Sequence, residues 1–201
     1  MNNTNNVNIR KATMDESKKI SMLHKDNINK GFLSLLGEKF LTLLYISLIK
    51  SENSVCIVAE KNNEIIGFVA FSHNIKKTYK EFILRYFFNI LFIIFLKMFN
   101  FKIMKMIFET LLYPVKESLS LPESELLSIA VKKEFQGMGI SKKLFDFMVS
   151  YAKKKNIKSF KVIVGEKLIQ AKRFYEKCGG VKVGEINIHG KEKSYIYVWN
   201  L

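Results

Sequence analysis

The spacing of apolar and polar positions predicts a chain of alternating strands and helices. Short apolar runs, bounded by Gly, Pro, Asn or charged residues, are typical of strands. They predict strands over residues 7–13, 54–60, 64–72, 125–131, 159–164, 181–188 and 194–199. Apolar residues that recur every three or four positions indicate amphipathic helices. They predict helices over residues 14–28, 38–49, 140–155 and 167–177.

A long apolar, aromatic and basic insertion, residues 75–116, separates the third and fourth of these strands. Its longest run without charge is Tyr86–Leu96, eleven residues. A membrane-spanning helix needs about 20 apolar residues, so this run is too short to span a bilayer. Two readings remain open: helices that pack in the core or in a dimer interface, or an amphipathic segment that lies on an anionic membrane.

Length and composition favour one ordinary globular domain of 201 residues. The chain starts without the basic and apolar regions of a secretory signal. Its two cysteines, Cys56 and Cys178, cannot form a disulfide framework and are typical of a reducing, cytoplasmic compartment. We therefore expect a cytoplasmic protein.

Charge is the unusual property, because 33 basic residues stand against 18 acidic ones, a net +15. Such an excess favours a polyanionic partner. Only three of the basic residues are Arg, which makes sequence reading of DNA a poor explanation. The charge lies mainly in two stretches, residues 75–116 at +6 and residues 131–161 at +7. We expect no nucleic-acid partner and a separate cause for each stretch.

A glycine turn, Gln136-Gly137-Met138-Gly139-Ile140-Ser141, joins a strand to a helix inside the second basic stretch. Glycine lets backbone N–H groups approach an anion, and a helix N-terminus adds partial positive charge. The turn lacks the Gly-Lys-Ser/Thr of a nucleotide-triphosphate loop and the third glycine of a dinucleotide fingerprint. By itself it is either a phosphate cradle or only a tight turn.

The run LLSIAVKKEFQGMGISKKLFDFMVSYAKKK, followed by a strand and by AKRFYEKCGG, resembles the GNAT superfamily of acetyl-CoA-dependent N-acetyltransferases. The family signature Q/R-x-x-G-x-G/A corresponds to Gln136, Gly139 and Ser141, and Ser141 departs mildly from it. The resemblance implies one α/β acyltransferase domain over residues 1–201, with a GNAT-like mixed, mostly antiparallel sheet of about seven strands. Helices flank the sheet, and residues 75–116 form a helical insertion between its third and fourth strands.

The same resemblance implies a binding site for acetyl-CoA as cosubstrate. It assigns the pyrophosphate to the glycine turn and pantetheine to the backbone of the preceding strand. The implied residues are Ile129, Ala130, Val131, Gln136, Gly137, Met138, Gly139, Ile140, Ser141 and Lys142. The family's usual Asn near the next helix is replaced by Leu168, so that contact is absent or relocated. The usual Phe is replaced by Gly180, which predicts a hole in the packing.

Two residues are candidates for catalysis. Tyr175 stands at the family's A-x-x-x-Y offset, where many members use a phenol to protonate the leaving thiolate; alternatively it only packs against the sheet. Glu125 stands where several members place the base that deprotonates the acceptor amine; alternatively it lies in solvent at the strand end. Glu123 is the second choice for the base.

The predicted function is therefore transfer of acetyl from acetyl-CoA directly to a primary amine, with a small molecule or amino sugar favoured as acceptor. The alternative is a CoA-binding or membrane-docking module with little or no turnover. The scattered His24, His73 and His189 do not suggest a metal site, and His73 is either a substrate contact or a surface residue. The insertion 75–116 is expected to form the acceptor pocket, a homodimer contact, or a peripheral contact with an anionic membrane.

Overall fold

The computed structural model describes residues 7–28, 32–97, 100, 105, 121–189 and 192–201. These residues form a mixed α/β fold around one seven-stranded sheet with the order β1-β2-β3-β4-β5-β7-β6. Neighbouring strands are antiparallel except β4 and β5, which are parallel. The strands are β1 (Asn8–Lys11), β2 (Ser54–Lys61), β3 (Glu64–Ser72), β4 (Glu125–Val131), β5 (Ser159–Gly165), β6 (Val181–His189) and β7 (Glu192–Asn200). The predicted fold class is confirmed.

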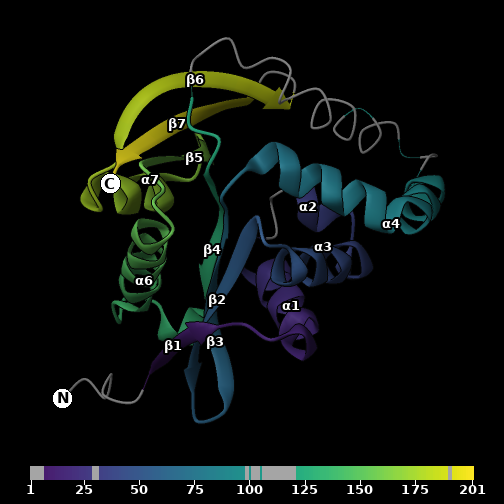
Figure 1. Ribbon diagram of the computed structural model, residues 1–201, viewed down its shortest axis with the longest axis horizontal. Helices are drawn as coiled ribbons and strands as arrows, with labels where there is room; N and C mark the ends of the chain where they lie inside the picture. The colour runs from purple at the N-terminus through teal and green to yellow at the C-terminus, as the bar shows by residue number, and fades with distance from the viewer. Residues whose placement is uncertain (1–6, 29–31, 98–99, 101–104, 106–120, 190–191) are drawn as a thin grey trace.

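Helices cover both faces of the sheet (Figure 1). One face carries α6 (Ile140–Lys154) and α7 (Ile169–Lys177). The other face carries α1 (Ser17–Asn27), α2 (Phe32–Leu35), α3 (Glu38–Lys50) and α4 (Ile75–Lys97). Two short 3₁₀ turns complete the described elements, η1 (Met14–Glu16) and η3 (Lys133–Phe135). No helix in this described part of the chain is long and apolar enough to cross a membrane.

Most elements differ from the sequence prediction by one or two residues at an end, and only β3 and β4 have their predicted limits. The helix expected from residue 14 begins with η1, because a capping box between Thr13 and Glu16 holds that turn. The helix expected from Lys167 begins at Ile169, and α2 was not predicted. The first half of the insertion is the helix α4, as expected. Of its second half, residues 98–99, 101–104 and 106–116 lie outside the described residues.

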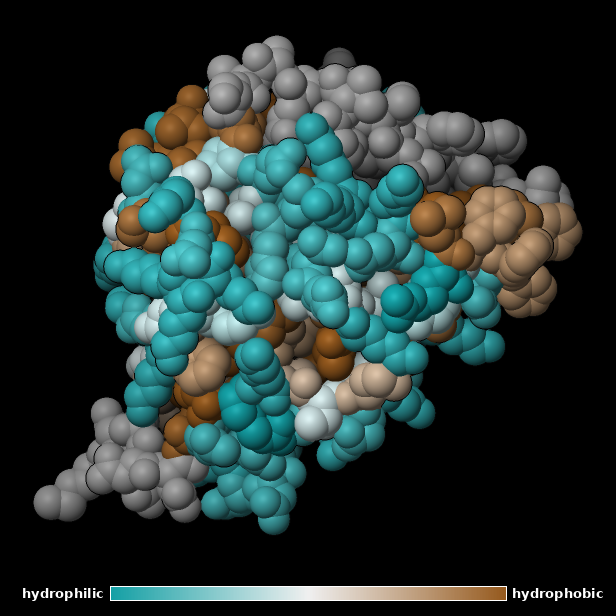
Figure 2. Space-filling view, in the orientation of Figure 1, coloured by the Kyte–Doolittle hydropathy of each residue, from teal (hydrophilic) through white to brown (hydrophobic). Residues whose placement is uncertain are grey.

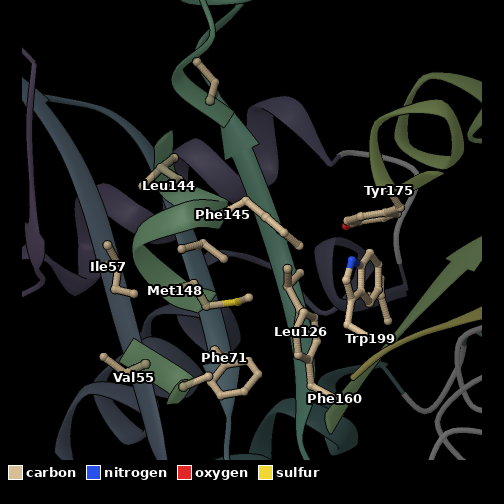
Figure 3. Close-up of a cluster of buried hydrophobic side chains, with 14 of the residues drawn as sticks. Val55, Ile57, Phe71, Leu126, Leu144, Phe145, Met148, Phe160, Tyr175 and Trp199 are labelled. Atoms are coloured by element: carbon tan, nitrogen blue, oxygen red, sulfur yellow. The ribbon is translucent and has the colours of Figure 1, made fainter. Parts of the chain in front are cut away.

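Each face of the sheet has its own apolar core. The core under α6 and α7 centres on aromatic residues, with Phe160 stacked on Trp199 at a centroid distance of 4.9 Å (Figure 3). The predicted hole at Gly180 does not exist. A Cβ at Gly180 would lie 2.7 Å from Cη2 of Trp199, so the indole occupies the space in question. The Trp199 Nε1–H also donates to the carbonyl of Cys178 at 2.9 Å, which fixes the ring there.

The strand β4 is irregular on both edges, and this irregularity shapes the centre of the sheet. On one edge its register with β3 shifts, because Phe71 pairs with Leu126 while Ala70 pairs with Ser128. Leu127 is the extra residue, a β-bulge that bends the strand. On the other edge β4 pairs with β5 only at Glu125 and Lys161. The two parallel strands therefore separate along their length, with their junction at the Glu125 end.

Candidate active site

The glycine turn has the geometry of an anion-binding helix N-terminus. Gly137 and Gly139 have φ angles of 78° and 77°, which non-glycine residues rarely adopt. The side chain of Gln136 donates from Nε2 to the carbonyl of Val131 at 2.9 Å and so ties the turn to the end of β4. The first amides of α6 have no intrahelical acceptor, as at any helix start, and they point out of its N-terminus.

Open space in front of these amides makes the turn suitable for a phosphate. A Cβ built on Gly137 or Gly139 meets no atom within 4 Å, so both glycines border an unfilled volume. The positive end of the α6 dipole faces this volume, which favours an anion there. The residues present thus fit the pyrophosphate that the sequence assigns to this turn.

The lysines around the turn have partners that the sequence did not reveal. Lys132 forms an ion pair with Glu64, and Lys142 pairs with Asp146 one turn further along α6 at 2.5 Å. The pair with Asp146 raises the pKa of Lys142. Lys161 is buried on β5 and lies far from a solvated helix face. Backbone amides and few of the lysines in this +7 stretch therefore remain for phosphate binding.

The residues expected to pair with pantetheine lie on β4 beside the separating strands. Ile129, Ala130 and Val131 pair on their other side with Val69, Phe68 and Gly67 of β3. Beyond Glu125 and Lys161, no pairing between β4 and β5 occurs among the described residues. The β5-facing edge of β4 at Ile129 to Val131 is thus available to an extended ligand, which would add to the strand by backbone hydrogen bonds.

Tyr175 lies on α7 next to this gap. The residue is buried, and its ring packs edge-on against Trp199 at 5.9 Å between centroids. Its hydroxyl oxygen points from α7 toward β4 (Figure 3). Burial raises the pKa of Tyr175, so the phenol keeps its proton at neutral pH. The ring of Tyr175 thus packs in the core, while its hydroxyl faces the gap between β4 and β5. This position is compatible with both alternatives stated for Tyr175, packing against the sheet and protonation of the leaving thiolate.

Glu125 is buried at the junction of β4 and β5 and does not lie in solvent. Only 8% of the residue is exposed, and its Oε2 lies 3.9 Å from Nζ of Lys161, which is 1% exposed. The charge of Glu125 contributes to a raised pKa of Tyr79, whose main cause is burial. Tyr79 belongs to α4, so the insertion contributes a phenol to the surroundings of Glu125. Lys161 and Tyr79 were missed from the sequence, although a lysine within the apolar run SFKVIV was a signal.

Glu123 and His73 lie near the Glu125 end of the sheet but outside the pair of Glu125 and Lys161. Glu123 is exposed and accepts a hydrogen bond from Asn74 Nδ2 at 2.5 Å. His73 packs against Tyr151 of α6 at 5.5 Å between centroids, at the Glu125 end of the sheet and on the α6 side. The side chain of His189 lies outside the described residues. Among the residues described, no group of three or more His, Cys, Asp or Glu side chains is placed to hold a metal ion.

A buried polar chain behind β4 was not predicted. Tyr45 of α3 lies 2.6 Å from Nδ1 of His24 and 3.1 Å from Oγ of Ser128, measured from its hydroxyl oxygen. His24 is 2% exposed, and burial lowers its pKa to about 4. The chain fixes Ser128, the residue next to the bulge, from the α1 and α3 side. The three residues are far apart in sequence, so no local pattern could reveal the contact.

The model of the acetyltransferase (GNAT) family matches residues 26–180, which is most of the sequence. The chain belongs to the GNAT acetyltransferase family. It is thus an acyltransferase, and its family implies acetyl-CoA as cosubstrate. No curated protein matches the sequence.

Solved GNAT structures share the fold over nearly the whole chain. A putative GNAT acetyltransferase from Desulfovibrio desulfuricans has a TM-score of 0.63 and 12% identity, and the match covers 96% of this chain and 98% of that one. An N-acetyltransferase from Staphylococcus aureus Mu50 has a TM-score of 0.63 and 14% identity, over 97% and 98%. The ribosomal-protein-S18-alanine N-acetyltransferase from Escherichia coli has a TM-score of 0.60 and 12% identity, over 96% and 93%. At such identities the likeness concerns the fold alone.

Proposed function

We propose that this GNAT enzyme transfers the acetyl group of acetyl-CoA directly to a primary amine of a small acceptor, a small molecule or amino sugar. One observation carries the proposal: β4 and β5 separate between the anion-binding turn at one end and the buried Glu125 at the other. An extended thioester that starts at the turn and pairs with β4 would place its reactive end near Glu125 and Tyr175.

The cosubstrate would be held mainly by the main chain. The amides of residues 136–141 would bind the pyrophosphate, with Lys142 at the edge of the same site. The backbone of Ile129, Ala130 and Val131 would pair with pantetheine. A backbone N–H of β4 at the reactive end would polarise the thioester carbonyl, because a fixed N–H stabilises negative charge on that oxygen as it develops.

The acceptor amine would approach from the α4 side of the sheet, where Glu125 and Lys161 lie together. Its nitrogen attacks the carbonyl carbon, a C–N bond forms, and the C–S bond breaks. Glu125 takes the proton lost by the nitrogen, directly or through a water molecule. Tyr175 gives its proton to the leaving thiolate, and the high pKa of its phenol keeps that proton available at neutral pH.

Calorimetry with acetyl-CoA, followed by thiol release with a panel of amines, tests this function. We expect binding and release with at least one amine. Tyr175→Phe should lower kcat by about 100-fold and leave the Kd of acetyl-CoA unchanged, as expected for loss of a general acid. Tyr197→Phe is the matched control, since the Tyr197 hydroxyl donates to Glu176 at 2.7 Å and has no proposed role.

The outcomes separate the proposal from its alternative. Binding of acetyl-CoA without thiol release for any amine would favour a CoA-binding module. Unchanged kcat in Tyr175→Phe would remove the acid role of that residue alone. Absence of acetyl-CoA binding would contradict the proposed cosubstrate site altogether.

A further inference from the structure

We propose that the outward side of α4 docks this enzyme on an anionic phospholipid membrane. This surface, the α4 outer face, consists of exposed apolar side chains on one helix. Its members are Leu84, Phe87, Phe88, Leu91, Phe92, Phe95 and Leu96. Figure 2 shows brown and tan residues gathered over the right-hand end of the molecule, where Figure 1 places the C-terminal half of α4.

The exposure of these residues is large for their chemistry. Phe88 is 81% exposed and Leu84 is 70% exposed, while Phe92 and Phe95 are each exposed by about 60%. Single apolar residues on a surface are ordinary, but a continuous apolar patch marks an interaction site. The backbone of α4 is kinked at Tyr86 (φ −121°, ψ 23°). Six of the seven members follow the kink, on residues 87–97, which span about 16 Å at about 1.5 Å per residue.

The opposite side of α4 is already used by the protein. Phe82 is buried and packs edge-on against Phe40 of α3 at 5.4 Å between centroids. Tyr86, Ile90 and Ile93 also pack against the core on this face of the sheet. The helix therefore cannot leave the core to insert as a separate element, and the α4 outer face can only meet a partner that lies flat against it.

The charges of α4 favour an anionic partner. Lys76, Lys77, Lys80 and Arg85 are all exposed. The acid of the described helix, Glu81, is turned toward the protein, where it accepts hydrogen bonds from Ser51 and from Asn53 Nδ2, the latter at 2.6 Å. The exposed charges of α4 are thus all positive beside a wide apolar patch. Aromatic and aliphatic residues flanked by cations are typical of helices that lie in the headgroup region of anionic lipid.

A second copy of the chain fits this surface less well. A two-fold interface brings the same patch of both subunits together. Such an interface would bring the cations of both copies of α4 close together at a contact from which water is excluded. The described helix has no exposed acid that could pair with them. An anionic bilayer supplies both the apolar phase and the opposite charge.

Vesicle co-sedimentation of the whole protein tests the proposal. We expect binding to phosphatidylcholine vesicles that contain phosphatidylglycerol, and on the order of tenfold weaker binding to pure phosphatidylcholine. Binding to the anionic vesicles should fall as salt is raised. Equal binding to both vesicle types, or none to the anionic ones at low salt, would overturn the proposal.

Two pairs of matched variants locate the contact. The double variant Phe88→Ser, Phe95→Ser should weaken vesicle binding by about tenfold or more. Its control is the double variant Val181→Ser, Val183→Ser, which removes exposed apolar residues from β6 and should leave vesicle binding unchanged. The double variant Lys77→Glu, Lys80→Glu should weaken vesicle binding by a similar factor. The same charge change at Lys153 and Lys154 of α6 should weaken vesicle binding much less.

Two further measurements test whether something other than a membrane covers the α4 outer face. If light scattering shows a dimer that the Phe88 and Phe95 variant dissociates, the face belongs to a second copy and the proposal fails. If that variant instead lowers the melting temperature as a core substitution does, the chain itself covers the face, and the proposal fails again. Each variant should keep the wild-type Kd for acetyl-CoA, which separates docking from the proposed catalysis.

Discussion

The helices α4 and α6 cover opposite faces of one sheet, and each belongs to one of the two basic stretches. On α6 the buried residues are Ile140, Leu144, Phe145, Met148 and Ala152, and most of the outward positions are charged or polar. On α4 apolar residues face both inward and outward. Since both helices bury one apolar side against the protein, their outward sides carry the difference. The outward side of α6 is mostly polar, whereas the outward side of α4 keeps exposed apolar side chains, and the proposed membrane contact rests on this difference.

The cations of the two helices differ in the same way. On α6, Lys142 has Asp146 as a partner four residues later, a pairing that holds the charge on the helix surface. On α4 the one acid, Glu81, is engaged by Ser51 and Asn53. Similar net charges in the two stretches of sequence, +6 and +7, thus lie in different surroundings. Charge near α6 surrounds the proposed anion site at the glycine turn, and charge on α4 flanks an apolar face.

Truncating one phenylalanine on each helix should give the largest difference in the free energy of unfolding between α4 and α6. Phe145→Ala on α6 leaves a cavity in the core and should lower the free energy of unfolding by about 3–5 kcal/mol. Phe88→Ala on α4 removes an exposed ring and should change it by less than about 0.5 kcal/mol. Urea unfolding measures both. Similar losses at the two positions would show that the α4 outer face is buried by the chain, and the contrast would disappear.

Breaking the ion pair of Glu125 and Lys161, on the α4 side of the sheet, should lower the stability of the protein nearly as much. Lys161→Met leaves the Glu125 carboxylate buried without its cation and should lower the free energy of unfolding by about 3 kcal/mol. Replacing both residues, with Glu125→Leu added, should restore part of that loss because no buried charge is left. Urea unfolding of the two single variants and the double variant completes the cycle. Additive losses would show that the two charges do not interact.

Histidines on the two sides of the sheet should give different acid sensitivity. The pKa of His24, about 4 through burial, lies below the 6.5 of an unfolded chain. The unfolded state therefore binds more protons in this window, and stability that is complete above pH 6.5 should fall by about 3 kcal/mol toward pH 4.

The measurement is the free energy of unfolding against pH, with one variant for each side. His24→Gln should flatten the profile between pH 6.5 and 4. His73, half-buried against Tyr151 on the α6 side, also has a lowered pKa, and burial is again the main cause. His73→Gln should flatten the profile less, because less of that ring is buried. An unchanged slope in His24→Gln would mean that other groups set the acid limit.

The glycine turn of α6 should combine a small loss of stability with a specific loss of binding. Gly139→Ala and Gly37→Ala each place a Cβ at a positive φ, 77° and 95°, and each should cost about 1 kcal/mol. Only Gly139→Ala puts the methyl group at the proposed pyrophosphate site. We expect it to weaken acetyl-CoA binding by about tenfold in calorimetry, a loss of about 1.4 kcal/mol, while Gly37→Ala leaves the Kd unchanged. Equal Kd values would move the pyrophosphate away from this turn.

Local patterns were sufficient for most of the elements. The strand Glu125–Val131 and the hairpin partner Glu64–Ser72 were predicted with their observed limits, because an apolar run between turn residues is a short-range signal. The family was also predictable, since the strand, glycine turn and helix are contiguous in the sequence. Placement of Trp199 over Gly180 was not, because that contact joins two strand ends through the core.

The amino-acid sequence by itself determined the order of the strands and the longer helices, the GNAT family and the glycine turn at Gly137 and Gly139, because each depends on neighbouring residues. Only the tertiary structure decided which charges meet and which surfaces stay open. It brought Lys161 and Tyr79 to Glu125, joined His24 to Ser128 through Tyr45, and left Phe88 and Phe95 facing outward. These outcomes depend on the packing of segments that are distant in sequence, and periodicity along one helix cannot say which of two apolar sides the core will cover.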